Sequence, residues 1–483
     1  MSRKVLASLL LVLVLAGCPQ DEPARQANDL PFAGQEIRIA VPAEFGFRGV
    51  WEGPLNEWAA QSGARYTLTE YPPSDGPGPF EGSSDPPQAT LAIFPLELAG
   101  EIIAAGKLAP IPPALLEGDE NGLAWQDLFA GVREKLASRK SQPLFIPLSA
   151  PVLVCYFRQD LLTAAGLAPP QTWDDYQQLL DSLANWAPEC TAVEPWSDAF
   201  GATMFLARAV SLAQHPGQYS LFFDIDTGEP LIDSPGFVRA LEAARTALAK
   251  MPAEVRRYNP ADCRNELLRG RAALAISYET PPIGSPSETA ASAERQEGLE
   301  IGFIRLPGSR EIYDNDRRIW QPVADKAVNR VTLAAFSGWG VGASARNSPV
   351  QTEASWNALL KICGDSLAAG FPPGIVELCR ESQLQNAGIA ASRLESREAV
   401  AYANAVAHSL RETRLVADLP IIGRAQFRLA LARGLAAAID GPMAPEQALE
   451  GVARDWREIA KKLGRTKVRD SYRSSLGLSP KPK

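Results

Sequence analysis

The sequence predicts an α/β protein of two or three domains. Its 483 residues are 46% hydrophobic and 22% charged, which is ordinary for a globular protein of that size. Short apolar runs typical of strands occur at 37–41, 66–70, 90–94, 272–277 and 301–306. Helical spacing of apolar residues recurs between these runs and throughout the last third of the chain. This alternation of the two patterns favours the α/β class.

The stretch from 143 to 183 is the most informative. A β-rich apolar run broken by Pro147 and Pro151 leads into a short helix that ends near Gly166. After a break at two prolines, a second helix is expected to begin at Thr172, whose hydroxyl can cap the first turn, with Asp175 completing a partial capping box. One face of this helix is apolar, which predicts that it packs against a neighbouring element.

Motifs in this stretch and beyond it occur in a specific order. YFRQDL at 156–161 is followed by AGL at 165–167 and PQTWDD at 170–175. Further along the chain come LLRGRAALAISY at 267–278, GFIRLPG at 302–308, GVGASARN at 340–347 and GPMAPEQAL at 441–449. In this order the motifs resemble the extracellular solute-binding proteins of ABC importers, in the group that includes maltose-binding protein.

The resemblance implies a type II periplasmic-binding-protein fold, with two discontinuous α/β lobes joined by a hinge. Crossings near 151, 298 and 336 would assign residues 34–151 and 298–335 to lobe I and residues 152–297 and 336–465 to lobe II. The basic end of the chain, 466–483, lacks apolar periodicity and is expected to be a flexible tail.

The N-terminus indicates export. Arg3 and Lys4 precede an apolar run that ends in Leu-Ala-Gly-Cys at Cys18, so residues 1–18 are identified as a lipoprotein signal, with lipid carried by Cys18. The alternative is a plain secretory signal with an incidental cysteine. Residues 19–33 would form a linker, and the protein would be periplasmic or at the cell surface, anchored to a bacterial membrane by lipid alone.

Five further cysteines would then lie in a compartment that permits disulfides. Cys363 and Cys379 flank a Gly/Pro loop and are expected to pair. Cys190 and Cys263, both in loop-like contexts, are the second expected pair, and Cys155 is expected to be a buried free thiol. The spacing fits no zinc site.

Loops that follow strands in an α/β domain line its ligand crevice, which nominates Phe45, Phe47 and Trp51 after the first strand. For Trp51, packing at the start of the next helix is an equal alternative. Trp339 stands between two glycines that would let the backbone approach a ligand or bend at a hinge.

The resemblance to maltose-binding protein nominates Glu194 and Trp196 as sugar contacts, with Asp198 close by, and Tyr278 after a buried strand. An indole can stack on a pyranose while carboxylates accept hydrogen bonds from its hydroxyls. The alternative is a loop tryptophan that covers a helix end.

The expected function is therefore capture of a small polar solute, with a sugar or oligosaccharide favoured, between the lobes and its delivery to an ABC permease. A binding module for sensing or surface attachment, and a hydrolytic lipoprotein, are the alternatives. Only two histidines occur and H-E-x-x-H, G-x-S-x-G and P-loop patterns are absent, so an enzyme, a cofactor and a metal site are not expected. The net charge of −8 argues against a nucleic-acid partner, and a monomer is expected.

Overall fold

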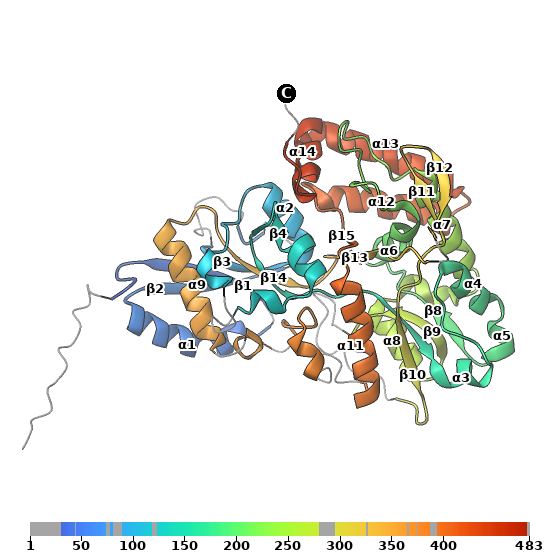
Figure 1. Cartoon of the computed structure of the whole chain (residues 1–483), viewed down its shortest axis with the longest axis horizontal. Helices are drawn as coiled ribbons and strands as arrows, with labels where there is room; N and C mark the ends of the chain where they lie inside the picture. Colours follow the sequence, from blue (N-terminus) through green and yellow to red (C-terminus); the bar gives the residue numbers. More distant parts are fainter. Residues whose placement is uncertain are drawn as a thin grey trace, which may run out of the picture.

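Two α/β lobes lie side by side in the computed structural model (Figure 1). The structure describes residues 30–43, 45–73, 78–80, 89–117, 123–279, 295–324, 327–364, 367–372, 374–386 and 394–480. The predicted lipoprotein signal with Cys18, and residues 19–29 of the predicted linker, lie outside these ranges.

The first lobe is built on a five-stranded sheet of order β2-β1-β3-β14-β6. β1 pairs in parallel with β2 and β3, whereas β14 is antiparallel to β3 and β6. The first three strands lie where the sequence predicted them, although their burial differs: β3 is buried throughout, whereas most of β2 is exposed or half-buried. The strand bounds are β1 Glu36–Pro42, β2 Arg65–Tyr71, β3 Leu91–Pro95, β6 Ile146–Ser149 and β14 Trp339–Ala343.

The second lobe is built on a four-stranded sheet of order β10-β7-β9-β8. β7 lies between β10 and β9 and is antiparallel to both, and β8 extends the sheet in parallel to β9. Every residue of β7 and β9 is buried, which explains their continuous apolar sequences. The bounds are β7 Val154–Arg158, β8 Thr191–Val193, β9 Ala272–Ser277 and β10 Ile301–Arg305.

Helices cover both sheets. In the first lobe, α1 (Phe47–Ser62) packs against α9 (Pro349–Cys363), with Trp58 Nε1 donating to Asn357 Oδ1 at 2.8 Å, and the short α2 (Ala99–Ala104) follows β3. The second lobe carries the other helices: α3 Gln159–Ala164, α4 Trp173–Asp181, α5 Leu183–Trp186, α6 Gly201–Ala213, α7 Pro235–Leu248, α8 Pro260–Leu268, α11 Ser396–Arg411, α12 Arg424–Ile439 and α13 Pro445–Leu463. The capping box at Thr172 and Asp175 is present, and α4 begins where the sequence predicted.

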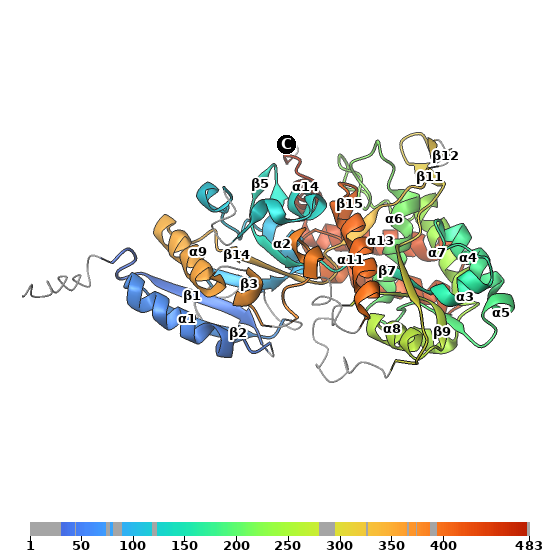
Figure 2. The same cartoon turned by 60° about the horizontal axis from the view of Figure 1, so that its bottom comes forward.

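Shorter pairs of strands complete the fold. β11 (Glu311–Asp314) and β12 (Ile319–Pro322) form a hairpin, and β4 (Ser138–Arg139) pairs with β5 (Gln142–Pro143). β13 (Thr332–Ala334) pairs in parallel with β15 (Leu415–Ala417), and this pair lies between the lobes (Figures 1 and 2).

The sheet pairing corrects the expected lobe boundaries. β10 is hydrogen-bonded to β7, so residues 298–335 continue the second lobe instead of returning to the first. β14 lies between β3 and β6, and α9 packs on α1, so the segment from Trp339 to Cys363 belongs with the first lobe. The chain therefore crosses between β6 and β7 and again between β13 and β14, and it returns to the second lobe before α11.

The expectation of a flexible tail at 466–483 is wrong for residues 466–480, the part of it that the structure describes. Residues Arg465–Ser475 form a helix, α14, whose Val468 and Tyr472 are 1% and 2% exposed. The Tyr472 hydroxyl accepts hydrogen bonds from the backbone N–H groups of Leu221 and Phe222 at 3.0 and 3.1 Å. The buried residues of α14 are Val468, Ser471 and Tyr472, of which only Val468 is fully apolar. Apolar residues at helical spacing are therefore hard to recognise in this basic segment.

The end of the expected linker is also packed. Phe32 is 6% exposed, its N–H donates to the Ser62 carbonyl at 2.8 Å, and its ring lies 6.3 Å from that of Trp58. Residues 30–33 thus belong to the first lobe.

The two expected disulfides are wrong, because all four cysteines are free thiols with other surroundings. The Cys379 thiol is directed at the Pro147 carbonyl (3.7 Å), and Cys363 lies in the core at the end of α9. The Cys190 thiol donates to the Gly270 carbonyl at 3.4 Å, whereas Cys263 is fully buried on α8. Burial raises the pKa of Cys363 and of Cys379 to about 12. Cys155 is a buried free thiol, as expected.

Candidate functional site

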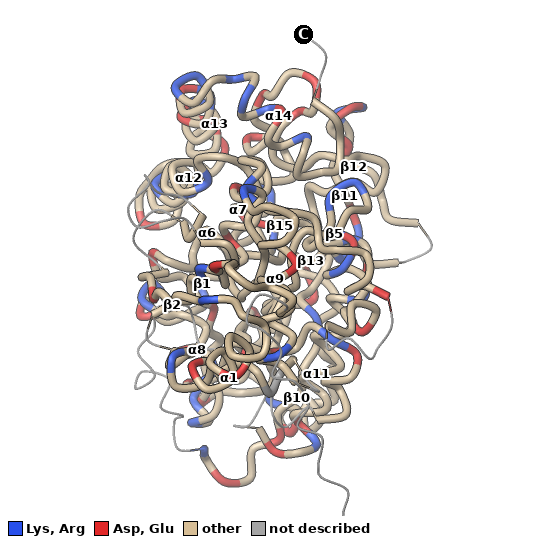
Figure 3. The backbone as a smooth tube through the Cα atoms, turned by 90° about the vertical axis from the view of Figure 1, so that its left-hand side faces the viewer, with Lys and Arg blue, Asp and Glu red and all other residues tan. Residues whose placement is uncertain are grey.

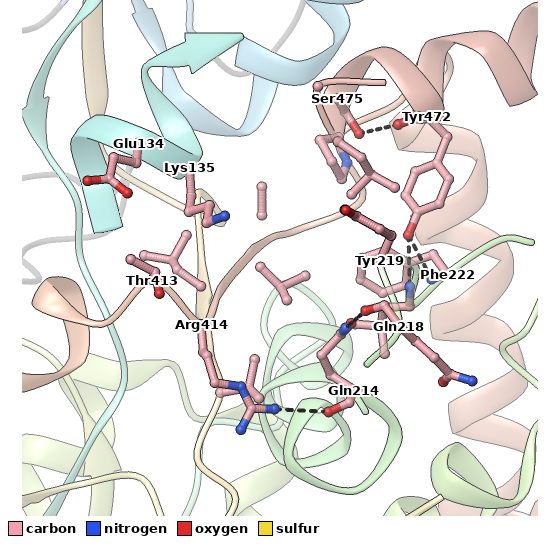
Figure 4. A pocket seen from close by; sticks show the side chains of 18 of the residues that line it. Glu134, Lys135, Gln214, Gln218, Tyr219, Phe222, Thr413, Arg414, Tyr472 and Ser475 are labelled. Atoms are coloured by element: carbon pink, nitrogen blue, oxygen red, sulfur yellow. Dashed lines mark hydrogen bonds between the residues drawn. The ribbon is translucent and has the colours of Figure 1, made fainter. Parts of the chain in front are cut away.

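A cavity of about 380 Å³ opens between the lobes (Figure 4). This volume falls within the range of roughly 300–1,000 Å³ that is usual for small-molecule sites. Two further cavities have volumes of about 10 and 20 Å³, too small for a solute. Segments from both lobes line the large cavity, namely 134–140, 214–222, 413–420 and 472–477, together with Val331.

The first-lobe wall is a turn of helix followed by a hairpin. A π-helical turn at Val132–Leu136 leads into β4, and Lys140 and Ser141 make the turn to β5 with φ of 50° and 61°. Positive φ at two successive residues is typical of a tight hairpin turn that follows the twist of its strands. The Arg139 guanidinium is fixed there, because its Nη1 donates to the carbonyls of residues 135, 136 and 138.

The second-lobe wall begins where α6 ends. Gln214 Nε2 donates to the Gln218 carbonyl at 2.7 Å, which shapes the loop that carries Tyr219. Tyr219 is 72% exposed although it lines the cavity. Arg414, from the segment leading into β15, donates to the Gln214 carbonyl at 3.1 Å and to Asn329 Oδ1. These bonds hold the guanidinium beside the cavity (Figure 4).

α14 closes one side of the cavity with Tyr472, Ser475 and the residues that follow. It packs on α13 in the second lobe and on α2 in the first, and in Figure 1 it lies over the junction between them. Beyond the helix, Lys140 Nζ donates to Ser479 Oγ at 3.2 Å. The C-terminal segment therefore connects the two lobes.

Basic residues predominate in the lining, in a chain whose net charge is −8. Four Lys or Arg side chains and one Glu, Glu134, line the cavity, whereas acidic and basic residues are interspersed over the rest of the backbone (Figure 3). Burial lowers the pKa of Arg139 to about 10 and also lowers that of Arg414, but both remain charged at neutral pH. The cavity thus presents positive charge to any solute inside it.

Next to the cavity, the lobes are in direct contact. Gly423 N–H at the start of α12 donates to Glu101 Oε1 of α2 at 2.8 Å, and Gly100 lies so close to Pro420 that a methyl group there would overlap it. Glu97 Oε2 is buried and has no hydrogen-bond partner among the described residues. Burial raises the pKa of Glu97 to about 7, although Arg424 opposes this effect.

Residues 77–308 match the family model of the bacterial extracellular solute-binding proteins. In sequence and in fold the chain resembles the maltose-binding-protein-like solute-binding proteins. The expected type II periplasmic-binding-protein fold is thereby confirmed, and the matched family and these structural neighbours are solute-binding proteins. A search of curated proteins finds no match.

Solved structures of solute-binding proteins share the architecture at low sequence identity. Maltose-bound MalE3 of T. maritima is 15% identical with a TM-score of 0.57, covering 88% of this chain and 99% of its own. The sugar-binding protein MalE of Xanthomonas citri is 14% identical with a TM-score of 0.58, covering 89% and 98%. A solute-binding protein of Agrobacterium radiobacter K84 in complex with ribitol is 17% identical with a TM-score of 0.57, covering 89% and 100%.

None of the eight residues nominated from the sequence lines the large cavity or the two small ones described above. Phe47 and Trp51 are fully buried, and Trp51 Nε1 donates to the Gly370 carbonyl at 2.6 Å, which is the packing alternative for that residue. Phe45 and Trp339 do meet, edge to face at 5.2 Å, but Trp339 is only 2% exposed.

The glycines beside Trp339 are explained by packing in the first lobe. Gly338 has φ of 100°, and a side chain there would overlap the Ser149 carbonyl. A side chain at Gly340 would meet the ring of Phe145. Close approach of strands and rings accounts for both glycines without a ligand.

Glu194 and Trp196 form a buried polar cluster in the second lobe. Glu194 is paired with Arg208 at 2.7 Å and accepts from Trp196 Nε1 at 2.8 Å, while the Arg208 guanidinium lies 4.3 Å from the centre of the Trp173 ring. Asp198 is exposed outside this cluster. Tyr278 is fully buried between Phe200 and Phe336, and burial raises its pKa. Ligand contact by these residues stays a prediction.

The cavity residues themselves escaped prediction from the sequence. Lys135, Tyr219 and Arg414 come from three distant segments, and no local motif distinguishes them. Among the described residues, no group of three or more His, Cys, Asp or Glu side chains is arranged to hold a metal ion. In the same part of the chain, no helix has the length and apolar character needed to cross a membrane.

Proposed function

We propose that the protein captures a sugar or polyol between its two lobes and delivers it to an ABC permease. The observation that carries this proposal is the polar cavity of about 380 Å³, which both lobes line within a solute-binding fold. Binding to both walls at once would favour the closed arrangement, and a ligand shifts that equilibrium by its differential affinity for the closed state.

The chemistry of the lining supports a polyhydroxylated ligand. Tyr219 offers an exposed ring on which the apolar face of a sugar can stack, and Thr413 and Ser475 add hydroxyl groups at the walls. Structural neighbours are described as bound to maltose, ribitol, D-mannitol and alpha-D-tagatose, which are all sugars or polyols.

Lipid attachment at Cys18 is part of the same proposal, because a tether would keep the loaded protein beside its permease. Mass spectrometry of the protein purified from membranes would test it. A lipid-modified N-terminal cysteine supports the anchor, whereas a water-soluble product cleaved elsewhere contradicts it.

A thermal-shift screen with these four compounds and a wider panel of sugars tests the binding function. A ligand present at 100 times its Kd should stabilise the protein by about 2.7 kcal/mol. The bound compound should be recovered unchanged, since release of a shorter product would indicate hydrolysis. The proposal fails if no sugar or polyol shifts the melting temperature and Tyr219→Ala behaves like the native chain towards every compound.

A further inference from the structure

Four cationic side chains gather at the cavity from two segments that are far apart in the sequence. Lys135, Arg139 and Lys140 come from the first-lobe wall, and Arg414 comes from the segment that leads into β15, on the same side of the cavity as Lys135 (Figure 4). None of the four forms an ion pair with a carboxylate anywhere in the described ranges. By contrast, the arginines that are buried in the described part of the chain do have such a partner, as Arg208 has in Glu194.

Two of the cations are held in place by neutral acceptors. Arg414 donates to a backbone carbonyl and to the Asn329 amide oxygen, and Arg139 donates to three backbone carbonyls. Neutral acceptors orient a guanidinium without cancelling its charge. The Arg139 Nε–H, buried at the wall, has no hydrogen-bond partner within the described part of the chain.

Lys135 and Lys140 are held less firmly than the two arginines, so their side chains can reorient towards a ligand. Lys135 is exposed at the cavity, and its ammonium group has neither a hydrogen bond nor an ion pair with any described residue (Figure 4). Lys140 reaches only the Ser479 hydroxyl, which can yield to a stronger acceptor. A partly enclosed site of this kind strengthens its attraction for an anion, because the local dielectric is lower than that of water.

Negative charge is scarce in the lining of the cavity. Glu134 is the one carboxylate in the lining, and its side chain is 51% exposed. It lies 3.8 Å from Arg133, which is outside the lining and donates to the carbonyls of Gln126 and Leu128. The uncharged hydroxyl groups at the wall suit the hydroxyls of a sugar, and the exposed Tyr219 ring suits its apolar face.

We infer that the solute is an anionic sugar or polyol, with its carboxylate or phosphate bound by Lys135, Lys140 and Arg414. This inference rests on the proposed binding function and narrows its ligand class. Carboxylate and phosphate both accept charge-assisted hydrogen bonds from Lys and Arg, so the shared chemistry is an oxyanion on a polyhydroxylated carbon skeleton.

Titration calorimetry on the full chain at low ionic strength tests the inference with three sets of probes. D-glucose and D-galactose are the neutral set, D-glucuronate, D-galacturonate and D-gluconate the carboxylate set, and D-glucose 6-phosphate the phosphate probe. We expect at least one anionic compound to bind about tenfold or more tightly than its neutral counterpart, with affinity that falls as salt is added. The carboxylate and phosphate sets identify which oxyanion is preferred.

Variants locate the contact. Lys135→Gln changes an exposed side chain without hydrogen bonds, so it should fold normally and weaken the anionic ligand about tenfold. Lys462→Gln, an equivalent loss of an exposed lysine on α13, should leave the affinity unchanged. Arg414→Lys keeps the charge and tests the bidentate geometry of the guanidinium.

The outcomes separate the two proposals. Equal affinity for neutral and anionic sugars, unaffected by Lys135→Gln, overturns the charge preference and leaves sugar binding in place. Anionic binding that is as strong in Lys135→Gln and Arg414→Lys as in the native chain overturns the assigned site. The absence of binding by every probe overturns both proposals for these sugars.

Discussion

Replacing Glu194 by alanine distinguishes a structural residue from a ligand contact. Glu194 and Arg208 are 0% and 1% exposed at their side chains, and the carboxylate also accepts from the Trp196 indole. In the variant, the Arg208 charge stays buried without its partner, and two of its nitrogens, Nε and Nη1, already lack acceptors in the described structure. Removing one partner of a buried pair costs about 3–5 kcal/mol, and the indole N–H left without an acceptor adds about 1 kcal/mol.

A loss of about 5 kcal/mol corresponds to a fall of roughly 10–20 °C in the melting temperature of a unit of 150–250 residues. Differential scanning calorimetry of the ligand-free protein measures this change. Asp198→Ala is the matched control, because this neighbouring carboxylate is exposed and its loss should change stability by less than about 0.5 kcal/mol.

The double variant Glu194→Met with Arg208→Met removes both charges and should recover much of the lost stability, as apolar replacement of buried pairs often does. The reasoning is refuted if Glu194→Ala melts within 2 °C of the native protein, a margin of about 1 kcal/mol. If that variant also loses its response to a sugar, Glu194 is a ligand contact, as the sequence suggested.

Three further predictions concern other parts of the molecule. Gly100→Val should force α2 away from Pro420, so that small-angle scattering reports a larger radius of gyration, whereas an unchanged radius would show that the lobes do not meet there in solution. Glu97 has a pKa of about 7 in the folded protein against 4.5 for the free carboxyl, so the folded state binds more protons in this window and stability should fall by up to about 3 kcal/mol as pH rises from 4.5 to 7. Urea titrations should show that Glu97→Gln removes this part of the pH dependence, and identical pH profiles of the two proteins would contradict the assignment. In a chain that begins at residue 30, a thiol reagent should label only Cys190 quickly, because the other four cysteines are buried. Rapid labelling of any thiol in Cys190→Ser would contradict the burial of these four.

Local patterns predicted the elements of the fold better than their association. The run at 37–41 and the capping residues Thr172 and Asp175 act within a few residues of themselves, so strand and helix could be read directly. The strand that pairs with β10 could not be predicted in this way, because an apolar strand fits the edge of either sheet. Its pairing with β7 depends on hydrogen bonds between segments more than 140 residues apart in sequence.

The candidate site shows the same limit. Aromatic residues such as Trp51 and Trp339 attract attention as ligand platforms, yet burial of a large ring in the core stabilises the fold whether or not a ligand is present. The cavity instead depends on Lys135, Tyr219 and Arg414, whose significance arises only when three segments meet. The wrong prediction of two disulfides has a similar origin, because proximity of Cys363 and Cys379 in sequence does not make their thiols face each other.

The C-terminal helix α14 has a consequence for the timing of uptake. It rests on α13 in one lobe and on α2 in the other, so a rotation that widens the gap must first release one of these two contacts. The rate at which a solute enters or leaves would then depend on release of this contact as well as on motion at the hinge. In a chain ending at Gly464 these two contacts are lost, so we expect a bound solute to exchange faster and to stay bound for a shorter time.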